Sequence, residues 1–535
     1  MSRGRWRTVT ALVAFLATIA VISTYPVFSQ TYDEPAHLAA GMEWLSRGVY
    51  LYEAQHPPLP RVAAAIGPYL GGARSLGNSD MFDEGRAILG EGAHYRRMLL
   101  LARLGMLPFF GLILAICALW GARVAGPPGA ALATLFAAAN PNLLAHAGIA
   151  GTDMAPAACV AAAMYAWMRW REQPSPHRAA LFGVGMGLAT VAKFSALAFL
   201  GPMLVLGEAL RLLVPRRTSG TTTDRAAVPW RHALIGFAAA IFVVWGFYRF
   251  DVGTIWHHRI PVPAPELFHG FRPFLKHATE GHPAFLLGEV SYTGWWYYYL
   301  VALAVKSPLP LLALAVVGAV ASVRAARDAE RWPALVPLVG VVAVLAVSMK
   351  SHVDLGIRLM LSVYPFLAVL AARGTVFAWH RAGTRASVMV RRLAVALLLI
   401  TTITIPVSAW PDYLAYFNPV AGAKPERVLV DSNLDWGQDL YRLADTVRAR
   451  HIDSVRVHYF GSANLRAVGL PNARHLARNE RATGWIAASE TFLAGIWSDT
   501  ALAWLARRPP VARIGPSMRL YYIPPTDSAR RSNSR

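Results

Sequence analysis

The sequence predicts a mostly α-helical fold: a polytopic transmembrane bundle of about eleven helices, followed by a small soluble α/β domain. Composition is the first observation. Of 535 residues, 55% are hydrophobic and 15% are charged, and the mean hydropathy is +0.37, whereas a soluble domain carries about 25% charged residues. The second observation is a series of apolar runs close to the length of about 20 residues that a spanning helix needs. The third is a change, after residue 409, to shorter segments that alternate like strands.

The first apolar run follows Arg3, Arg5 and Arg7 and could be a secretory signal peptide. We interpret it as an uncleaved helix, because it lacks a convincing small-residue cleavage site and many apolar runs follow. The two runs that flank Lys193 are short, so they are the weakest pair of the set. The predicted spans cover residues 8–28, 98–121, 128–146, 153–170, 178–192, 195–213, 232–250, 295–320, 333–349, 358–378 and 392–409.

The basic residues between the runs predict the orientation of the bundle, because cytoplasmic loops carry an excess of Lys and Arg. With the N-terminus inside, the inner loops hold Arg123, Arg169, Arg171, Arg178, Arg211, Arg216, Arg217, Arg225, Arg231, Arg324, Arg327, Arg331, Arg373, Arg381, Arg385, Arg391 and Arg392. The first outer loop mixes acids and bases instead. We therefore predict a multi-pass protein of the cell (inner or plasma) membrane, with a cytoplasmic N-terminus and a periplasmic or extracellular C-terminal domain.

The net charge of +22 does not indicate a nucleic-acid partner, because the arginines occupy short loops rather than a stripe on a soluble fold. Cys117 and Cys159 both lie within apolar runs, so they provide neither a disulfide framework nor a zinc site. The sequence has no Walker A, GxGxxG, HExxH or CxxC motif, which disfavours nucleotide-driven transport and metalloprotease chemistry.

Three parts follow from this pattern. Residues 1–409 form the transmembrane part, including outer loops 29–97 and 251–294, residues 410–525 form the soluble domain, and residues 526–535 form a polar, disordered tail. In the soluble domain, helical spacing over 439–451 separates segments with strand character. These predicted strands cover residues 427–432, 454–460, 484–488 and 519–523.

The most informative acids stand where the first helix leaves the membrane. Asp33 and Glu34 are adjacent, and His56 follows in the same outer loop, before Pro57 and Pro58. Ionisable groups at the edge of a helix bundle indicate a functional site. The structural alternative is a solvated helix end at which Asp33 caps the next helix.

A second set of ionisable groups lies on the same predicted side of the membrane. Asp153 stands at the outer end of one predicted helix, where it could again be an N-cap. Four cations occupy outer turns, against the positive-inside trend: Lys193, Lys350, His352 and Arg358. Binding of a lipid phosphate would explain them, and snorkelling of long side chains is the alternative.

These features resemble those of the GT-C superfamily of integral-membrane glycosyltransferases, over roughly residues 10–410. The motifs that carry the resemblance are Asp33-Glu34, His56-Pro57-Pro58-Leu59, and the stretch from Asn140-Pro141 to Thr152-Asp153. The closer similarity is to the protein O-mannosyltransferase-like group, glycosyltransferase family 39, with the lipid A aminoarabinose transferases related to it. The protein O-mannosyltransferases carry a different luminal module, so a protein acceptor does not follow.

The C-terminal motif from Asp431 to Leu440, DSNLDWGQDL, also looks like one found in bacterial members of this group. Its acids, Asp431 and Asp435 among them, could bind a sugar or an acceptor. The alternative is a strand-to-helix turn with capping residues.

The resemblance implies transfer of a sugar from a polyprenyl-phosphate-linked donor to an acceptor on the outer side of the membrane. It implies Asp33 as the general base of one inverting displacement and Glu34 as its partner. His56, Asp153, Asp431 and Asp435 would bind acceptor or donor sugar, and Lys193, Lys350, His352 and Arg358 the lipid phosphate. Some relatives use a divalent metal, which Asp33, Glu34 and His56 could hold, although nothing in the sequence requires it.

Two other classes remain open from the sequence. A transporter or flippase of a lipid-linked intermediate would share the bundle and the basic outer turns, although we find no internal repeat of the kind that transporters often show. A scaffold whose soluble domain binds a cell-wall component would need outer acids that are dispersed and face solvent.

Overall fold

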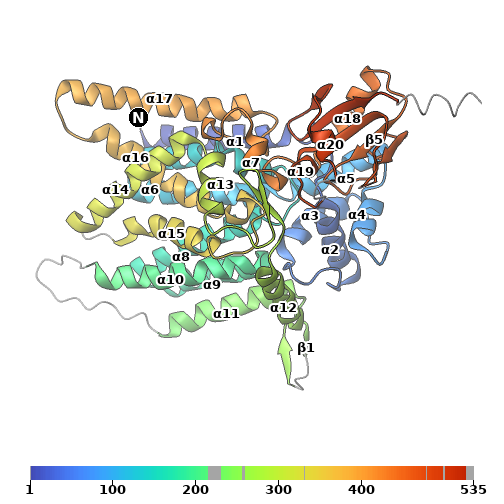
Figure 1. Ribbon diagram of the computed structural model, residues 1–535. Helices are drawn as coiled ribbons and strands as arrows, with labels where there is room; N and C mark the ends of the chain where they lie inside the picture. The colour runs from blue at the N-terminus through green and yellow to red at the C-terminus, as the bar shows by residue number, and fades with distance from the viewer. Residues whose placement is uncertain are drawn as a thin grey trace, which may run out of the picture.

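The computed structural model describes residues 2–214, 230–255, 260–329, 332–477, 479–497 and 501–525. The predicted tail 526–535 and the basic residues Arg216, Arg217, Arg225 and Arg331 lie outside these ranges. The long helices run side by side at one end of the molecule, and the C-terminal sheet stands at the other end with helices of the first outer loop (Figure 1). Because apolar helices and a small sheet occupy separate ends, the predicted fold class is confirmed.

Every predicted span is largely helical. The long helices of the bundle are α1 (Arg3–Ile22), α6 (Leu107–Ala138), α8 (Met154–Glu172), α9 (Pro176–Ala192), α10 (Phe194–Leu213), α11 (Trp230–Phe247), α14 (Leu309–Ala329), α15 (Val336–Ser348), α16 (Val363–His380) and α17 (Arg385–Ala409). Within the described ranges, six helical stretches meet the length and apolarity needed to cross a membrane: Arg3–Ile22, Gly92–Ala138, Phe194–Leu213, Trp230–Phe247, Leu309–Ala326 and Arg385–Ala409. The chain is therefore a multi-pass membrane protein, with fewer full-length apolar helices than the eleven predicted.

Two of the predicted spans are interrupted by proline. The run 295–320 divides into α13 (Tyr298–Lys306) and α14, because Pro308 has no N–H to continue the helix. The run 128–146 divides into the end of α6 and α7 (Pro141–Ala147) at Asn140, whose side chain caps α7. Both were predicted as single helices, and both are corrected here.

Two other breaks agree with the prediction. Inside α6, non-helical backbone at Ala125 and Gly126 precedes Pro127 and Pro128, and the chain turns back so that Gly129 lies against Gly121. The predicted runs on either side of Arg123 are therefore separate helices. Lys193 has an extended backbone and separates α9 from α10. The weakly predicted pair is thus two helices.

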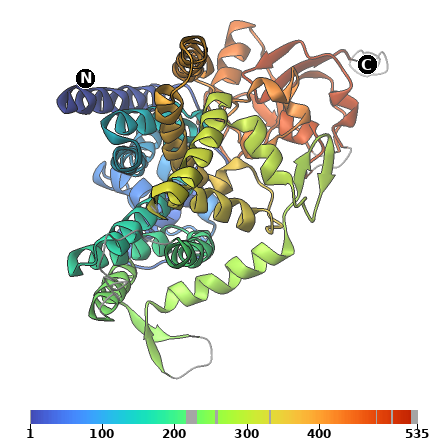
Figure 2. The same cartoon turned by 90° about the vertical axis from the view of Figure 1, so that its left-hand side faces the viewer.

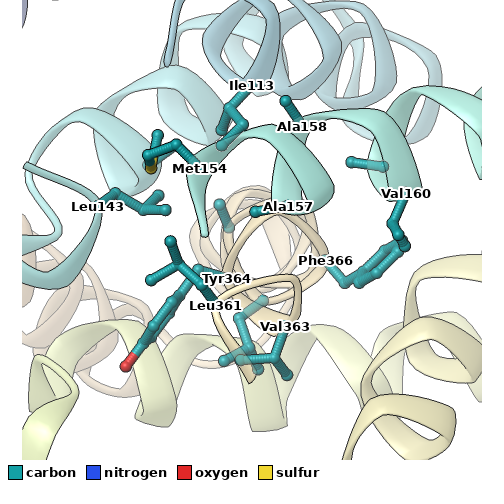
Figure 3. Packing of buried hydrophobic residues seen from close by; sticks show 14 of the residues in the cluster. Ile113, Leu143, Met154, Ala157, Ala158, Val160, Leu361, Val363, Tyr364 and Phe366 are labelled. Carbon is teal, nitrogen blue, oxygen red and sulfur yellow. The ribbon is translucent and has the colours of Figure 1, made fainter. Parts of the chain in front are cut away.

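Small side chains and branched apolar side chains fill the centre of the bundle. Leu143 and Met154 face the segment around Leu361 and Tyr364, and Val160 lies near Phe366 (Figure 3). All six side chains are essentially inaccessible to solvent. This packing fixes the ends of α7, α8 and α16 relative to one another, and these ends carry or adjoin the predicted site residues.

The soluble domain contains a five-stranded mixed sheet in the order β6-β5-β7-β9-β8. The strands are β5 (Val455–His458), β6 (Ala473–His475), β7 (Gly484–Ser489), β8 (Ala512–Ile514) and β9 (Met518–Ile523), and α18 (Leu440–Ala449) precedes them. Strand β5 is parallel to β6 and β7, while β7–β9 and β8–β9 are antiparallel. Short helices α19 (Glu490–Leu493) and α20 (Ala503–Ala506) complete the domain.

The predicted strand over residues 427–432 is wrong. This segment forms two short 3-10 turns, η4 (Pro425–Arg427) and η5 (Asp431–Asn433). Pro425 starts the first turn, and Asp431 has a left-handed backbone (φ 56°), which a strand does not accommodate. The other three predicted strands correspond to β5, β7 and β9.

The first outer loop is largely helical and packs against the soluble domain. It contains α2 (Glu34–Arg47), α3 (Leu59–Leu70), α4 (Met81–Leu89) and the start of α5 (Gly92–Leu104). Leu38, Met42 and Leu99 share one hydrophobic core with residues of the domain such as Leu443 and Val457. The loop and the domain are therefore parts of one packed unit.

The second outer segment, residues 251–294, runs along one side of the molecule (Figure 2). It contains the hairpin of β1 (Val252–Thr254) and β2 (Pro261–Pro263), helix α12 (Pro265–Glu280), and the hairpin of β3 (Ala284–Leu286) and β4 (Glu289–Ser291). Phe271 and Phe274 of α12 contact Phe194 at the start of α10, with ring centroids 5.5 Å apart in each pair. Helix α12 therefore forms a wall beside the outer end of the bundle.

Candidate active site

A large cavity lies where the outer ends of the bundle meet the first outer loop. It encloses about 1740 Å³ between the protein atoms, open solvent included. Asp33 contributes from the start of α2, Lys193 from the turn between α9 and α10, and Arg358 from a 3-10 turn, η2 (Ile357–Met360), that precedes α16. Three predicted site residues that are far apart in sequence thus line one cavity, which we call the bundle cavity.

Ionic contacts connect these residues at the centre of the cavity. The Lys193 ammonium donates to Asp153 Oδ1 at 2.7 Å. Arg358 Nη1 lies 3.4 Å from Asp33 Oδ2 and 3.6 Å from Asp153 Oδ2. Two cations therefore face two carboxylates. Because the guanidinium is shared between two acids at long distances, an anionic ligand could compete for it.

Asp33 and Asp153 occupy N-cap positions, of α2 and α8 respectively, but their side chains do not cap these helices. Neither side chain accepts a hydrogen bond from the first turn of its helix. Burial raises the pKa of Asp33 above its ordinary value, and the positive charge of Arg358 opposes that rise. The Asp33 side chain retains 28% exposure, so a ligand in the cavity can reach it. The capping alternative is wrong at both positions.

Glu34 has a different environment from its neighbour. Its oxygens accept hydrogen bonds from Arg103 Nε and Nη2, both at 2.9 Å, and from the backbone N–H groups of Thr31 and Ala150. Arg103 also donates to the carbonyl oxygens of Tyr25, Phe28 and Ser29. Glu34 is not among the residues that line the bundle cavity. It holds the segment that precedes Asp33.

His56 lines the bundle cavity as part of a polar group. Its Nδ1 lies 2.9 Å from Glu53 Oε1, and Glu53 also pairs with the buried Arg61. His37, from α2, lines the cavity beside them, with its ring centroid 6.0 Å from that of His56 and its buried Nδ1 without a hydrogen-bond partner. The sequence prediction missed Glu53 and His37, although His37 lies only four residues after Asp33.

The remaining predicted phosphate ligands differ in position. Lys350 lines the bundle cavity at the end of α15 and is exposed. His352 is exposed and is not among the lining residues. The structure therefore brings Lys193, Arg358 and Lys350 to one cavity and leaves His352 outside it.

A second cavity adjoins the first on the side of the soluble domain. It encloses about 820 Å³, open solvent included, and shares Asp33, His282, Leu355 and Arg358 with the bundle cavity. Its other lining residues are Tyr32, Asp431, Trp436, Phe460, Phe492 and Trp497. We call it the domain cavity. Asp33 and Arg358 thus stand where the two cavities meet.

The two acids of the C-terminal motif have unlike positions. Asp431 lines the domain cavity, whereas Asp435 is fully buried and lines neither cavity. Asp435 accepts hydrogen bonds from the Thr491 N–H at 3.0 Å and the Ser489 hydroxyl at 3.3 Å. Burial raises the pKa of Asp431 to about 6 and that of Asp435 to about 7.

Asp33, Glu34 and His56 do not form one ligand set, because Glu34 is bound to Arg103 away from the cavity. Over the described ranges, no group of three or more His, Cys, Asp or Glu side chains is arranged to hold a metal ion.

Comparisons with known proteins agree with this architecture. The family model described as dolichyl-phosphate-mannose-protein mannosyltransferase matches residues 52–254, which include His56, Asp153 and Lys193. No curated protein sequence matches the chain. The crystal structure of ArnT from Cupriavidus metallidurans bound to undecaprenyl phosphate is similar, with 14% identity, a TM-score of 0.50, and coverage of 96% of this chain and 99% of that chain. The apo state of the same protein gives 15% identity with the same TM-score and coverage.

At this level of identity the structural similarity concerns the fold. The chain therefore shares the fold of ArnT, and the family match over residues 52–254 agrees with the resemblance seen in the sequence.

Proposed function

We propose that this chain is a glycosyltransferase that moves a sugar from a polyprenyl-phosphate-linked donor to an acceptor hydroxyl on the outer side of the membrane. The observation that carries the proposal is the convergence of Asp33, Lys193 and Arg358 on the bundle cavity, with Asp153 paired to both cations. The ArnT structure that shares the fold was solved with undecaprenyl phosphate, a ligand of the same class as the proposed leaving group.

The composition of the bundle cavity supports a lipid-linked donor. Phe199 of α10, Leu275 of α12 and Val347 of α15 provide apolar walls that a polyprenyl chain can contact. Lys193 and Arg358 provide the positive charge that a phosphate needs, and Lys350 adds charge at an exposed position. At the polar end, His37, Gln55 and His56 can hydrogen-bond a sugar.

The reaction then proceeds as a single displacement at the anomeric carbon of the donor sugar, with Asp33 as the general base. The acceptor hydroxyl gives its proton to the Asp33 carboxylate while its oxygen bonds to the anomeric carbon. The bond between that carbon and the phosphate oxygen breaks, and the polyprenyl phosphate leaves with the electron pair. Lys193 and Arg358 stabilise the developing charge on the phosphate. Because attack and departure occur on opposite faces, the configuration at the anomeric carbon inverts.

Glu34 supports this reaction indirectly, because it holds Asp33 in position. Its buried pair with Arg103 fixes the turn between α1 and α2, so the Asp33 carboxylate stays at the mouth of the cavity. Asp153 has the same kind of role toward Lys193 and Arg358, because it holds both cations beside the predicted phosphate position.

The substitution Asp33→Asn tests the proposal. The purified chain is incubated with an undecaprenyl-phosphate-linked sugar and a glycan and lipid extract of the source cell envelope, and release of undecaprenyl phosphate is measured. We expect a loss of about 10²–10⁴-fold in rate, because general-base assistance has about that value. Binding of undecaprenyl phosphate should be largely retained.

Asp83→Asn is the matched control, because the Asp83 side chain is 63% exposed and pairs with Arg86 on the same helix. Its rate should equal that of the unmodified chain. Full transfer by Asp33→Asn would refute Asp33 as the base. Movement of intact donor across a vesicle membrane without release of undecaprenyl phosphate would favour a flippase instead.

A further inference from the structure

The domain cavity is lined by aromatic side chains, and the binding of a lipid-linked donor in the bundle cavity does not account for them. Four of its aromatic residues surround an open space: Tyr32, Phe460, Phe492 and Trp497. Tyr32 stacks on Phe460 with ring centroids 5.3 Å apart, and Phe460 meets Phe492 edge-on at 6.0 Å. Trp497 is 40% exposed and contacts His282 with ring centroids 4.7 Å apart. These rings come from the first outer loop and the soluble domain.

The sheet places this cavity where α/β folds commonly bind ligands. Strands β5 and β7 are parallel neighbours, and Phe460 and Phe492 follow their carboxyl ends by two and three residues. Strand β6 pairs on the opposite side of β5, so the strand order reverses between β5 and β7. Ligands of open α/β sheets bind outside the carboxyl ends of the strands at such a point.

The C-terminal motif is fastened to this edge of the sheet. Asp435 accepts from Ser489, the last residue of β7, and from Thr491, two residues further along the chain. The Asp431 N–H donates to the Thr491 hydroxyl at 3.2 Å. Asp435 is therefore a positioning residue, and it fixes the backbone that carries Asp431.

Asp431, which lines the domain cavity, has one buried carboxylate oxygen without a hydrogen-bond partner. Its side chain accepts from the Ser432 N–H through Oδ1, whereas Oδ2 is buried without a hydrogen-bond partner. The residue is only 6% exposed and has a left-handed backbone. A non-glycine residue in that conformation, with a buried polar atom left unsatisfied, indicates a functional constraint.

We propose that the domain cavity binds a saccharide through its aromatic rings and Asp431, and that this saccharide is the acceptor. The identification as acceptor rests on the proposed transferase function, while the binding site stands on the geometry alone. The apolar C–H face of a sugar ring can lie on aromatic rings, which are amphipathic contact surfaces. A sugar hydroxyl would donate to Asp431 Oδ2, which would satisfy that oxygen. A neighbouring hydroxyl can then reach Asp33, because Asp33 lines the same cavity.

Other acceptor classes fit this cavity less well. A lipid tail would need walls formed by the membrane-facing helices, but most of the lining residues come from the outer loop and the soluble domain. A peptide that adds to the sheet would pair with an edge strand, and the edges are β6 and β8 rather than β5 and β7.

The test measures binding without transfer. The full-length chain in detergent is applied to an array of neutral and acidic oligosaccharides, with immobilised peptides and phospholipid vesicles as comparison arms. We expect retention of at least one oligosaccharide class and about tenfold weaker binding for Asp431→Asn, the size expected for loss of a hydrogen bond to a charged group. Trp497→Ala, at a partly exposed position, should also weaken binding.

Matched controls lie on the same domain. Asp445→Asn removes an exposed acid of α18, and Tyr522→Ala removes a half-exposed ring of β9. Both should bind saccharide like the unmodified chain, and the midpoint of thermal unfolding of each variant is measured alongside. Saccharides of both free and lipid-linked form are included, so a free glycan and the head of a glycolipid are distinguished.

The outcomes separate this proposal from the transferase proposal. If no oligosaccharide is retained, or if folded Asp431→Asn and Trp497→Ala bind normally, the saccharide site is refuted. If donor turnover is found only with a peptide or a simple lipid acceptor, the saccharide proposal is refuted while the transferase function stands. If saccharide binds and depends on Asp431 but no donor is consumed, the site stands and the transferase proposal is refuted.

Discussion

The two cavities differ in the chemistry of their walls, although they share Asp33 and Arg358. The bundle cavity combines apolar side chains of α10, α12 and α15 with Lys193 and a group of histidines. The domain cavity combines aromatic rings with Asp431 and lies at the edge of a sheet. The bundle cavity therefore suits a lipid phosphate, and the domain cavity suits a sugar ring. Chemistry between two such ligands would occur at the shared residues, and substitutions should therefore act on one ligand, on the other, or on both.

Among substitutions of the cations, Arg358→Ala should have the largest effect, because Arg358 lines both cavities and contacts Asp33, Asp153 and the ring of Trp436. Loss of a group that stabilises developing charge costs about 10²–10³-fold in kcat. The positive charge of Arg358 also holds the pKa of Asp33 down. The acidic limb of the pH–rate profile should therefore move to higher pH in this variant.

Measurement of kcat, of the pH–rate profile and of binding of both ligands checks this prediction. Arg249→Ala is a control, since Arg249 lies over Trp44 away from both cavities. If the pH–rate profile of Arg358→Ala is unchanged, Arg358 does not influence the pKa of Asp33 during the reaction, and this prediction is wrong.

Lys193→Ala should affect the bundle cavity alone. We expect binding of undecaprenyl phosphate to weaken by about tenfold, as for loss of one charge-assisted hydrogen bond. Saccharide binding should not change, because Lys193 does not line the domain cavity. Both constants are measured on the same preparation, and equal weakening of both would remove the distinction between the cavities.

Removal of Lys193 leaves Asp153 without its 2.7 Å partner, which could destabilise the fold. The double variant Lys193→Ala/Asp153→Asn removes both charges and separates ligand binding from stability. Lys276→Ala, at an exposed position of α12, is the matched control.

The pH dependence of saccharide binding should be the smallest effect and should belong to the domain cavity. Burial raises the pKa of Asp431 to about 6. Above that pH the ionised carboxylate accepts a stronger hydrogen bond from a sugar hydroxyl, and below it the neutral acid accepts a weaker one. Affinity should therefore fall by a few-fold as the pH drops through about 6.

The neighbouring charged groups set the control for this measurement. Arg358 stays protonated, and burial lowers the pKa of His282 to about 4, so His282 titrates below this window. Asp33 has a raised pKa as well. The variant Asp431→Asn must therefore lose the step near pH 6, and its persistence would assign the step to Asp33.

Long-range features of the site could be predicted from the sequence, and local ones could not. Apolar length and the alternation of arginines placed Asp33, Asp153, Lys193 and Arg358 on one side of the bundle, and the structure brings these four together. The distinction between Asp33 and Glu34 was not predictable, because it depends on Arg103, which lies 69 residues from Glu34. Adjacent residues at a helix start point in different directions, so one acid lines a cavity and the next is buried.

The soluble domain shows the same limit. Strand-like sequence predicted β5, β7 and β9, but residues 427–432 have the same character and instead form 3-10 turns around a left-handed Asp431. The domain cavity depends on side chains from six separate segments of the chain, which only the tertiary fold brings together. No local pattern reports that arrangement.

The shared hydrophobic core of the first outer loop and the soluble domain has a consequence for protein engineering. Tyr95 of α5 meets Tyr441 of α18 edge-on, with ring centroids 6.2 Å apart, so a chain cut after Ala409 would expose the buried ring of Tyr95 to water. The domain is therefore not an exchangeable module. A chimera that aims to change acceptor choice should exchange residues 29–104 and 410–525 together, since either piece alone would meet a foreign partner across the packed surface.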